Sequence, residues 1–123
     1  MIEGVVNAAY EPVITLAVQG PPGRSRVIEA VVDTGFNGFL TLPATLVSEL
    51  GLPWVSIGRA TLADGSEIAY DVYGTTVLWD GQARYVEADA ADSTPLVGML
   101  LLDRHDLSVQ VRDGGRVVIQ IGE

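Results

Sequence analysis

The chain is organised around the stretch Ala30-Val31-Val32-Asp33-Thr34-Gly35-Phe36-Asn37-Gly38-Phe39-Leu40. Two β-branched residues lead into Asp33, Thr34-Gly35 turns the chain, and an apolar run resumes at Phe39. A buried strand that ends on Asp-Thr-Gly holds its carboxylate at the rim of a hydrophobic core, within reach of backbone N–H groups. This placement suits a catalytic carboxylate. A β-turn that ends a strand, with Asp as turn former, is the plainer interpretation of the tripeptide alone.

Length and composition predict one globular domain over residues 1–123. The chain is 48% hydrophobic, which is enough for a proper core. Fourteen Gly and six Pro are spread between short Val, Ile and Leu runs, and this pattern indicates many turns and many strands.

The charge balance limits the partners of the chain. Seven basic residues, all of them Arg, face sixteen acidic ones, which gives a formal charge of −9. Such a surface repels phosphate backbones and anionic headgroups, so we expect neither nucleic acid nor membrane as a partner. No Cys is present for a disulfide or a Cys-based metal site. Residues 1–4 show no signal-peptide pattern and no apolar run is long enough to span a bilayer, so a cytoplasmic location is expected.

Turn signals divide the rest of the chain into short strands. Asp64-Gly65 and Asp80-Gly81 each predict a hairpin. Pro43 and Gly51 bracket a short amphipathic helix, with Pro43 at its first position and Gly51 as its left-handed cap. Met99 to Asp106 is expected to form one or two helical turns. The predicted strands cover 5–9, 12–18, 26–32, 39–42, 54–62, 66–78, 83–88, 107–111 and 116–121.

The order of these segments resembles that of retropepsin-like aspartic proteases. The signature runs apolar-apolar-Asp33-Thr34-Gly35, a hairpin around Asp64-Gly65, the apolar-apolar-Gly run Leu96-Val97-Gly98, a helix and a final strand pair. The likeness covers about Val27 to Ile119. It implies an all-β fold, a closed acid-protease barrel with one or two short helices.

The resemblance also implies a catalytic site made by two copies of the chain. One Asp-Thr-Gly supplies one carboxylate, whereas the chemistry needs two that share a proton, so a homodimer is implied. Asp33 would activate a water for attack on a peptide bond, and Gly35 would offer its N–H to the carboxylate. Thr34 would hydrogen-bond across the dimer, or would be a plain packing residue of the turn. No metal or cofactor is required.

The hairpin tip Ala63-Asp64-Gly65-Ser66 would be the flap that closes over an extended peptide substrate. An ordinary surface hairpin is the alternative. Tyr70 and Tyr73 follow the tip and either line the cleft or serve packing.

Phe36 departs from the family pattern, which has Ser or Ala at this position. It is too large to pack as a small residue and has no hydroxyl for the carboxylate. Either Asn37 supplies that donor, or Phe36 turns outward into a substrate pocket.

Other constellations are weaker. Asp103-Arg104-His105-Asp106 contains the single His, but a metal site needs three or four convergent ligands, so a solvated helix end is the better interpretation. The predicted function is a homodimeric aspartic endopeptidase, with a catalytically inactive barrel that binds a peptide or protein as the alternative.

Overall fold

Residues 1–122 are the part of the chain that the computed structural model describes, and they form ten strands and one helix. The elements are β1 (Ile2–Val6), β2 (Pro12–Gly20), β3 (Arg24–Val32), β4 (Leu40–Leu42), α1 (Ala44–Leu50), β5 (Trp54–Thr61), β6 (Glu67–Trp79), β7 (Gln82–Ala90), β8 (Leu96–Val97), β9 (His105–Val109) and β10 (Arg116–Ile121). The predicted mostly-β class is confirmed.

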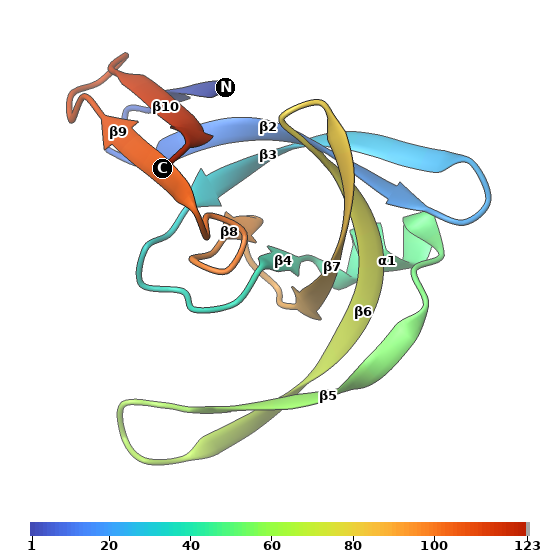
Figure 1. Ribbon diagram of the computed structural model, residues 1–123. Helices are drawn as coiled ribbons and strands as arrows, with labels where there is room; N and C mark the ends of the chain where they lie inside the picture. Colours follow the sequence, from blue (N-terminus) through green and yellow to red (C-terminus); the bar gives the residue numbers. More distant parts are fainter. Residues whose placement is uncertain (123) are drawn as a thin grey trace.

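Six strands close into a barrel in the order β6-β7-β4-β8-β3-β2, and β2 returns to pair with β6 (Figure 1). The long strand β2 allows this closure because it divides one edge between two partners. Its first residues pair with β1, and Ala17 to Gln19 pair with Leu78 to Thr76 of β6. The predicted closed barrel is therefore present.

The barrel interior is filled by alternating side chains of the strands. Ile14, Leu16 and Val18 of β2 are buried while Thr15 between them is exposed, as expected for a strand with one face on the core. The short helix α1 adds Leu46, Val47 and Leu50 to the same core. Gly51 ends the helix with a φ of 61°, as predicted, whereas Pro43 lies at the N-cap, one position before the expected one.

The strand predicted over Val5 to Ala9 begins earlier, at Ile2. It begins there because Ile2 and Glu3 pair with β10, and it ends at Val6 because the side-chain oxygen of Asn7 accepts hydrogen bonds from the N–H groups of Ala9 (3.0 Å) and Glu11 (2.9 Å). This local capture turns the chain before it can extend further.

The helix predicted over Met99 to Asp106 is wrong, since the segment forms successive turns and β9 already begins at His105. A first turn does form, since the N–H groups of Leu101 and Leu102 both donate to the Gly98 carbonyl (3.2 and 3.3 Å). Arg104 then adopts a φ of 66°, which a helix does not accommodate.

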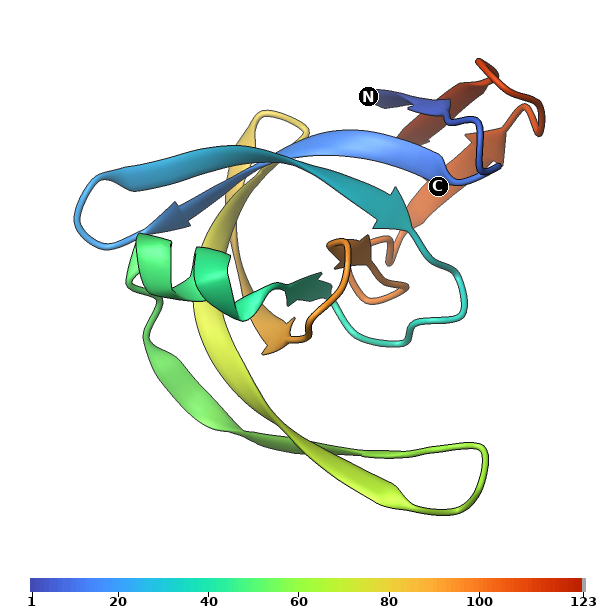
Figure 2. The same cartoon turned by 180° about the vertical axis from the view of Figure 1, so that it is seen from behind.

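Two parts of the sheet extend beyond the barrel. One is the projecting hairpin, which we define as β5, the turn 62–66 and residues 67–72 of β6; it curves away from the barrel beside the 33–39 loop (Figure 2). The other is the outer sheet β1-β10-β9, in which β9 lies at the end of the strand order.

Candidate functional site

Asp33 follows directly on the buried end of β3. Val31 and Val32 pair in parallel with Leu96 and Val97 of β8, and the Asp33 N–H donates to the Val97 carbonyl (2.9 Å). The Leu96-Val97 strand thus fixes the backbone on which the carboxylate stands. Its side chain is half-buried, at the rim of the core where the sequence predicted it.

The turn after Asp33 holds the carboxylate in one orientation. Oδ1 of Asp33 accepts the N–H of Gly35 at 2.8 Å, and the Phe36 N–H donates to the Asp33 carbonyl at 3.2 Å. A Cβ at position 35 would lie 3.2 Å from that Oδ1, so glycine permits the close approach. Thr34 and Gly35 are exposed at the surface.

Phe36 is accommodated by two glycines that face it. A Cβ at Gly38 would lie 2.5 Å from Cζ of Phe36, and one at Gly98 would lie 2.6 Å from its Cδ2. The ring therefore packs against the loop and the end of β8 and is half-buried. Within residues 1–122, Asn37 makes no hydrogen bond to Asp33, and the part of the Phe36 ring that is not packed against the glycines lines a pocket.

Asp33 and Thr34 border an apolar depression of about 380 Å³, which we call the Asp33 hollow. Its other walls come from the β1–β2 turn and from the outer sheet. The apolar side chains that line it include Val6, Tyr10, Val31, Leu107 and Val109.

Phe36 borders a different space, of about 410 Å³, which we call the hairpin cavity. Its opposite wall is one face of the projecting hairpin. Ala60 pairs with Ile68, and Gly58 with Tyr70, so these four positions share that face. The remaining wall carries Thr41 of β4 and residues 89–92. The hairpin and the loop that bears Asp33 thus enclose one cavity.

The predicted tip residues Ala63, Asp64, Gly65 and Ser66 are exposed at the end of the hairpin, whereas its strands line the cavity. Oδ1 of Asp64 accepts hydrogen bonds from the Ser66 hydroxyl (2.5 Å) and the Ser66 N–H (2.9 Å). Both bonds lower the pKa of Asp64 below its ordinary value of 3.8, and the bond from the hydroxyl has the larger effect. Of the two tyrosines, Tyr70 lines the cavity and Tyr73 packs against the barrel core.

Asp89 is a half-buried carboxylate in the hairpin cavity that the sequence analysis did not single out. Burial, followed by the charge of Glu87, raises its pKa above 3.8. The pKa of Tyr70 is raised as well, first by burial and then by the charge of Asp89. In the sequence, Asp89 continues the more exposed alternation of Tyr85 and Glu87 opposite Val86 and Ala88, so no local pattern marks it as a site residue.

His105 has a structural role. Its Nε2 accepts the Trp79 indole N–H (3.2 Å) and its Nδ1 lies 2.8 Å from the Asp103 carbonyl, so both ring nitrogens are used in the tautomer with hydrogen on Nδ1. Among residues 1–122 no group of three or more His, Cys, Asp or Glu side chains is placed to hold a metal ion. That same part of the chain has no helix of the length and apolar character needed to cross a membrane.

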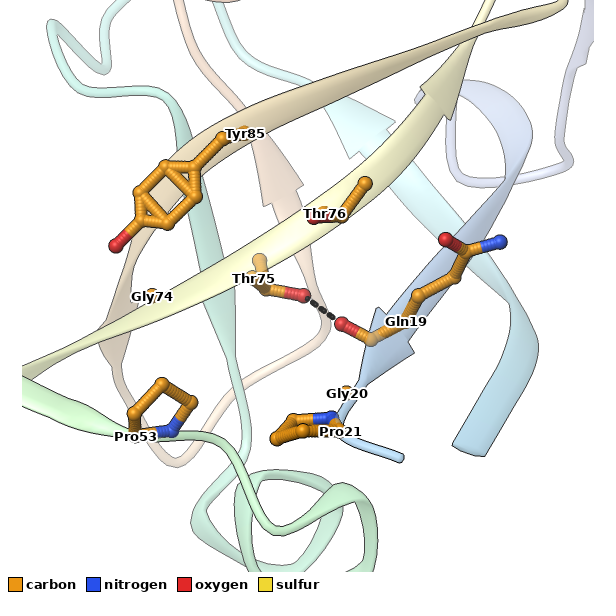
Figure 3. Close-up of a pocket in the computed structure, with 8 residues that line it drawn as sticks. All are labelled: Gln19, Gly20, Pro21, Pro53, Gly74, Thr75, Thr76 and Tyr85. Carbon is orange, nitrogen blue, oxygen red and sulfur yellow. Dashed lines mark hydrogen bonds between the residues drawn. The ribbon is translucent and has the colours of Figure 1, made fainter. Parts of the chain in front are cut away.

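A third hollow, of about 300 Å³, lies where β2 meets β6 (Figure 3). Thr75 directs its hydroxyl at the Gln19 carbonyl there, at 2.8 Å, while Pro21, Pro53 and Tyr85 form the walls. Its lining residues include no carboxylate, imidazole or amine, so it holds no acid–base chemistry. The functional candidate is therefore the region around Asp33.

Neither protein-family models nor curated proteins match this chain.

Proposed function

We propose that two copies of the chain form an aspartic endopeptidase, in which one Asp33 from each copy binds a shared water. The observation that carries the proposal is the Asp33 carboxylate itself. It stands at the end of a buried strand, is oriented by the Gly35 N–H (2.8 Å), and lies on the loop that faces the projecting hairpin. A carboxylate whose backbone is fixed on both sides is positioned at little further entropic cost when substrate binds.

The chemistry divides two roles between two identical carboxyl groups. The ionised Asp33 takes a proton from the water, and the oxygen of that water attacks the peptide carbonyl carbon. The protonated Asp33 of the other copy hydrogen-bonds the carbonyl oxygen, and a carboxyl then protonates the departing nitrogen. Gly35 keeps the carboxylate oriented, and Thr34 would contact the second turn across the two-fold axis.

The outer sheet offers an edge for the second copy. The Val and Ile content of the N-terminal strand and of Arg116 to Ile121 predicts pairing of two copies through these strands, but β1 lies between β2 and β10, and β10 lies between β1 and β9. Within residues 1–122 the far edge of β9 has no partner strand. Gln110 and Gly122 donate to Arg116 and Arg104 carbonyls, so the even-numbered residues of β9 face β10. The N–H groups of Leu107 and Val109 then point to the open edge.

Antiparallel pairing of two β9 edges around Ser108 would use these groups. Leu107 of one copy would then lie opposite Val109 of the other, and Asp106 opposite Gln110, so no like charges face each other. Leu107 and Val109 also border the Asp33 hollow. This pairing would therefore place the second copy on the side of the molecule where Asp33 needs its partner.

The projecting hairpin would act as the flap. One face of its paired strands lines the cavity beside Phe36, and within residues 1–122 the outer edge of β5 has no partner strand, so an extended peptide could add strand-like hydrogen bonds at that edge. Closure of the hairpin would exclude bulk water from the reacting carbonyl.

A catalytically silent barrel that binds a peptide in the same cleft is the second candidate. Phe36 favours it, because the family pattern has a small residue there, and Ser at that position can hydrogen-bond the carboxylate. In this chain Oδ1 of Asp33 has the Gly35 N–H, and Phe36 offers no side-chain donor.

The test is cleavage of an unbiased peptide library from mildly acidic to neutral pH, with an Asp33→Asn variant prepared identically. We expect wild-type cleavage with an optimum at intermediate pH, since the dyad needs one proton, and a loss of about 10³-fold or more in the variant. Cleavage that survives in the variant would contradict the proposal. Peptide binding without cleavage by a folded wild-type dimer would support the silent barrel instead.

A further inference from the structure

The hairpin cavity combines apolar walls with the carboxylates of Asp89 and Asp92. Ala60 and Ile68 on the projecting hairpin face Phe36 across a space of about 410 Å³. This is within the size range of side-chain and small-ligand pockets. Apolar walls of this kind fit the methylene groups of an extended side chain.

Asp89 lies at the base of this cavity. It stands opposite Val72 of β6 and Thr41 of β4, both of which are buried. Within residues 1–122 its carboxylate has neither a hydrogen bond nor an ion pair, and burial raises its pKa. A half-buried carboxylate without a partner is unfavourable, and a cation brought to it would relieve that cost.

Several arginines of the chain are engaged elsewhere. Arg26 pairs with Glu49 and Arg116 with Glu3. Arg84 donates to the Leu101 carbonyl at 3.0 Å and lies over the Phe39 ring. Within residues 1–122 no arginine forms an ion pair with Asp89, so a ligand could supply the cation, and the formal charge of −9 raises the local concentration of basic peptides.

We propose that the hairpin cavity is a specificity pocket for a lysine or arginine side chain of the substrate, with the cation bound by Asp89. The aliphatic stem lies between Phe36 and the hairpin residues Ala60 and Ile68. Asp92, exposed at the same cavity, provides a second acceptor. This assignment rests on the proposed function, because the side chain that enters the pocket belongs to a peptide substrate bound between the projecting hairpin and the Asp33 loop.

The first experiment measures cleavage of peptide libraries that fix one position as lysine, arginine, acetyl-lysine, leucine or glutamate. We expect lysine and arginine to be favoured at one position relative to the cleaved bond, by about tenfold over acetyl-lysine. Asp89→Asn should abolish most of that preference while cleavage continues.

Asp71→Asn is the matched control. Asp71 pairs with Ile57 on the same hairpin, lies on the face turned away from the cavity, and is exposed. Its substitution changes the net charge equally and should leave the preference for lysine intact. If both variants lose the preference for lysine and arginine equally, the assignment is overturned, because the preference would then come from the net charge of the protein.

A binding measurement separates failure of the pocket from failure of the enzyme. The Asp33→Asn protein is titrated with fluorescent lysine-containing library peptides and with their acetyl-lysine counterparts. Tighter binding of the lysine series supports the pocket even if the wild type cleaves nothing, in which case the protease proposal alone fails. Equal affinities for the two series, or no binding of either, would overturn the specificity pocket. Asp33-dependent cleavage without a preference for lysine or arginine would support the protease and contradict the pocket.

Discussion

Phe36 follows the Asp-Thr-Gly turn because positions 38 and 98 are glycine. A side chain at either position would overlap the aromatic ring, with a Cβ 2.5 or 2.6 Å from its carbon atoms. The sequence showed the large residue where the family pattern has a small one, and the structure shows the space that compensates for it. The ring consequently becomes a wall of the hairpin cavity.

Asp89 and Asp64 should change stability with pH in opposite directions. Burial raises the pKa of Asp89, so the ionised carboxylate destabilises the folded state increasingly as pH rises from 3.8 through the raised pKa. The pKa of Asp64 is lowered by Ser66, so its stabilising effect is lost as pH falls from 3.8 through the lowered value. At neutral pH, Asp89→Asn should therefore unfold at a higher temperature than the wild type and Asp64→Asn at a lower one.

Thermal unfolding of the three proteins at a series of pH values checks this pair. Both differences from the wild type should shrink at strongly acidic pH, where the carboxyl groups are protonated. Differences of the same sign at neutral pH would contradict the assignment of burial to one residue and hydrogen bonding to the other.

At the scale of elements, the barrel depends on the short contact between β2 and β6. Only Ala17, Val18 and Gln19 pair with β6 there, and the buried Thr75 adds a side-chain bond to the Gln19 carbonyl (Figure 3). This bond supplements a ladder of only three residue pairs between two long strands.

Thr75→Val should lower the free energy of unfolding by about 1 kcal/mol, because it removes that hydrogen bond at nearly constant volume. Thr76→Val is the control, since Thr76 lies on the same strand and its hydroxyl makes no hydrogen bond within residues 1–122. Its change should stay within about 0.5 kcal/mol. Urea unfolding measures both, and equal effects would contradict the role given to the Thr75 hydroxyl.

At the scale of the whole molecule, the proposed homodimer depends on the open edge of β9. Ser108→Glu would place two carboxylates side by side at the two-fold axis, so we expect the dimer dissociation constant to rise by about threefold or more. Ser48→Glu adds the same charge on the exposed side of α1 and should leave association unchanged. Sedimentation at several concentrations measures both variants. An unchanged dimer in Ser108→Glu would exclude pairing about this residue.

Local patterns predicted much of the fold. Asp64-Gly65 and Asp80-Gly81 form the predicted hairpins because their turn chemistry is contained in a few residues. The Gly51 cap is likewise local. The helix expected after Gly98 ends within its first turns, because Arg104 adopts a φ of 66° and His105 pairs with Ile121 of β10. Helical spacing carries no information about this pairing with a later strand.

The sequence by itself determined the hairpin turns, the Gly51 helix cap and the position of Asp33 after a buried strand, because each depends on neighbouring residues. Only the tertiary structure decided that Phe36, the projecting hairpin and Asp89 enclose one cavity. It also decided that β9, and not β10, is the outermost strand. These features come from pairings between strands that are far apart in the sequence. The alternation of side chains along a strand predicts which face is buried, but it does not predict which strand packs beside it.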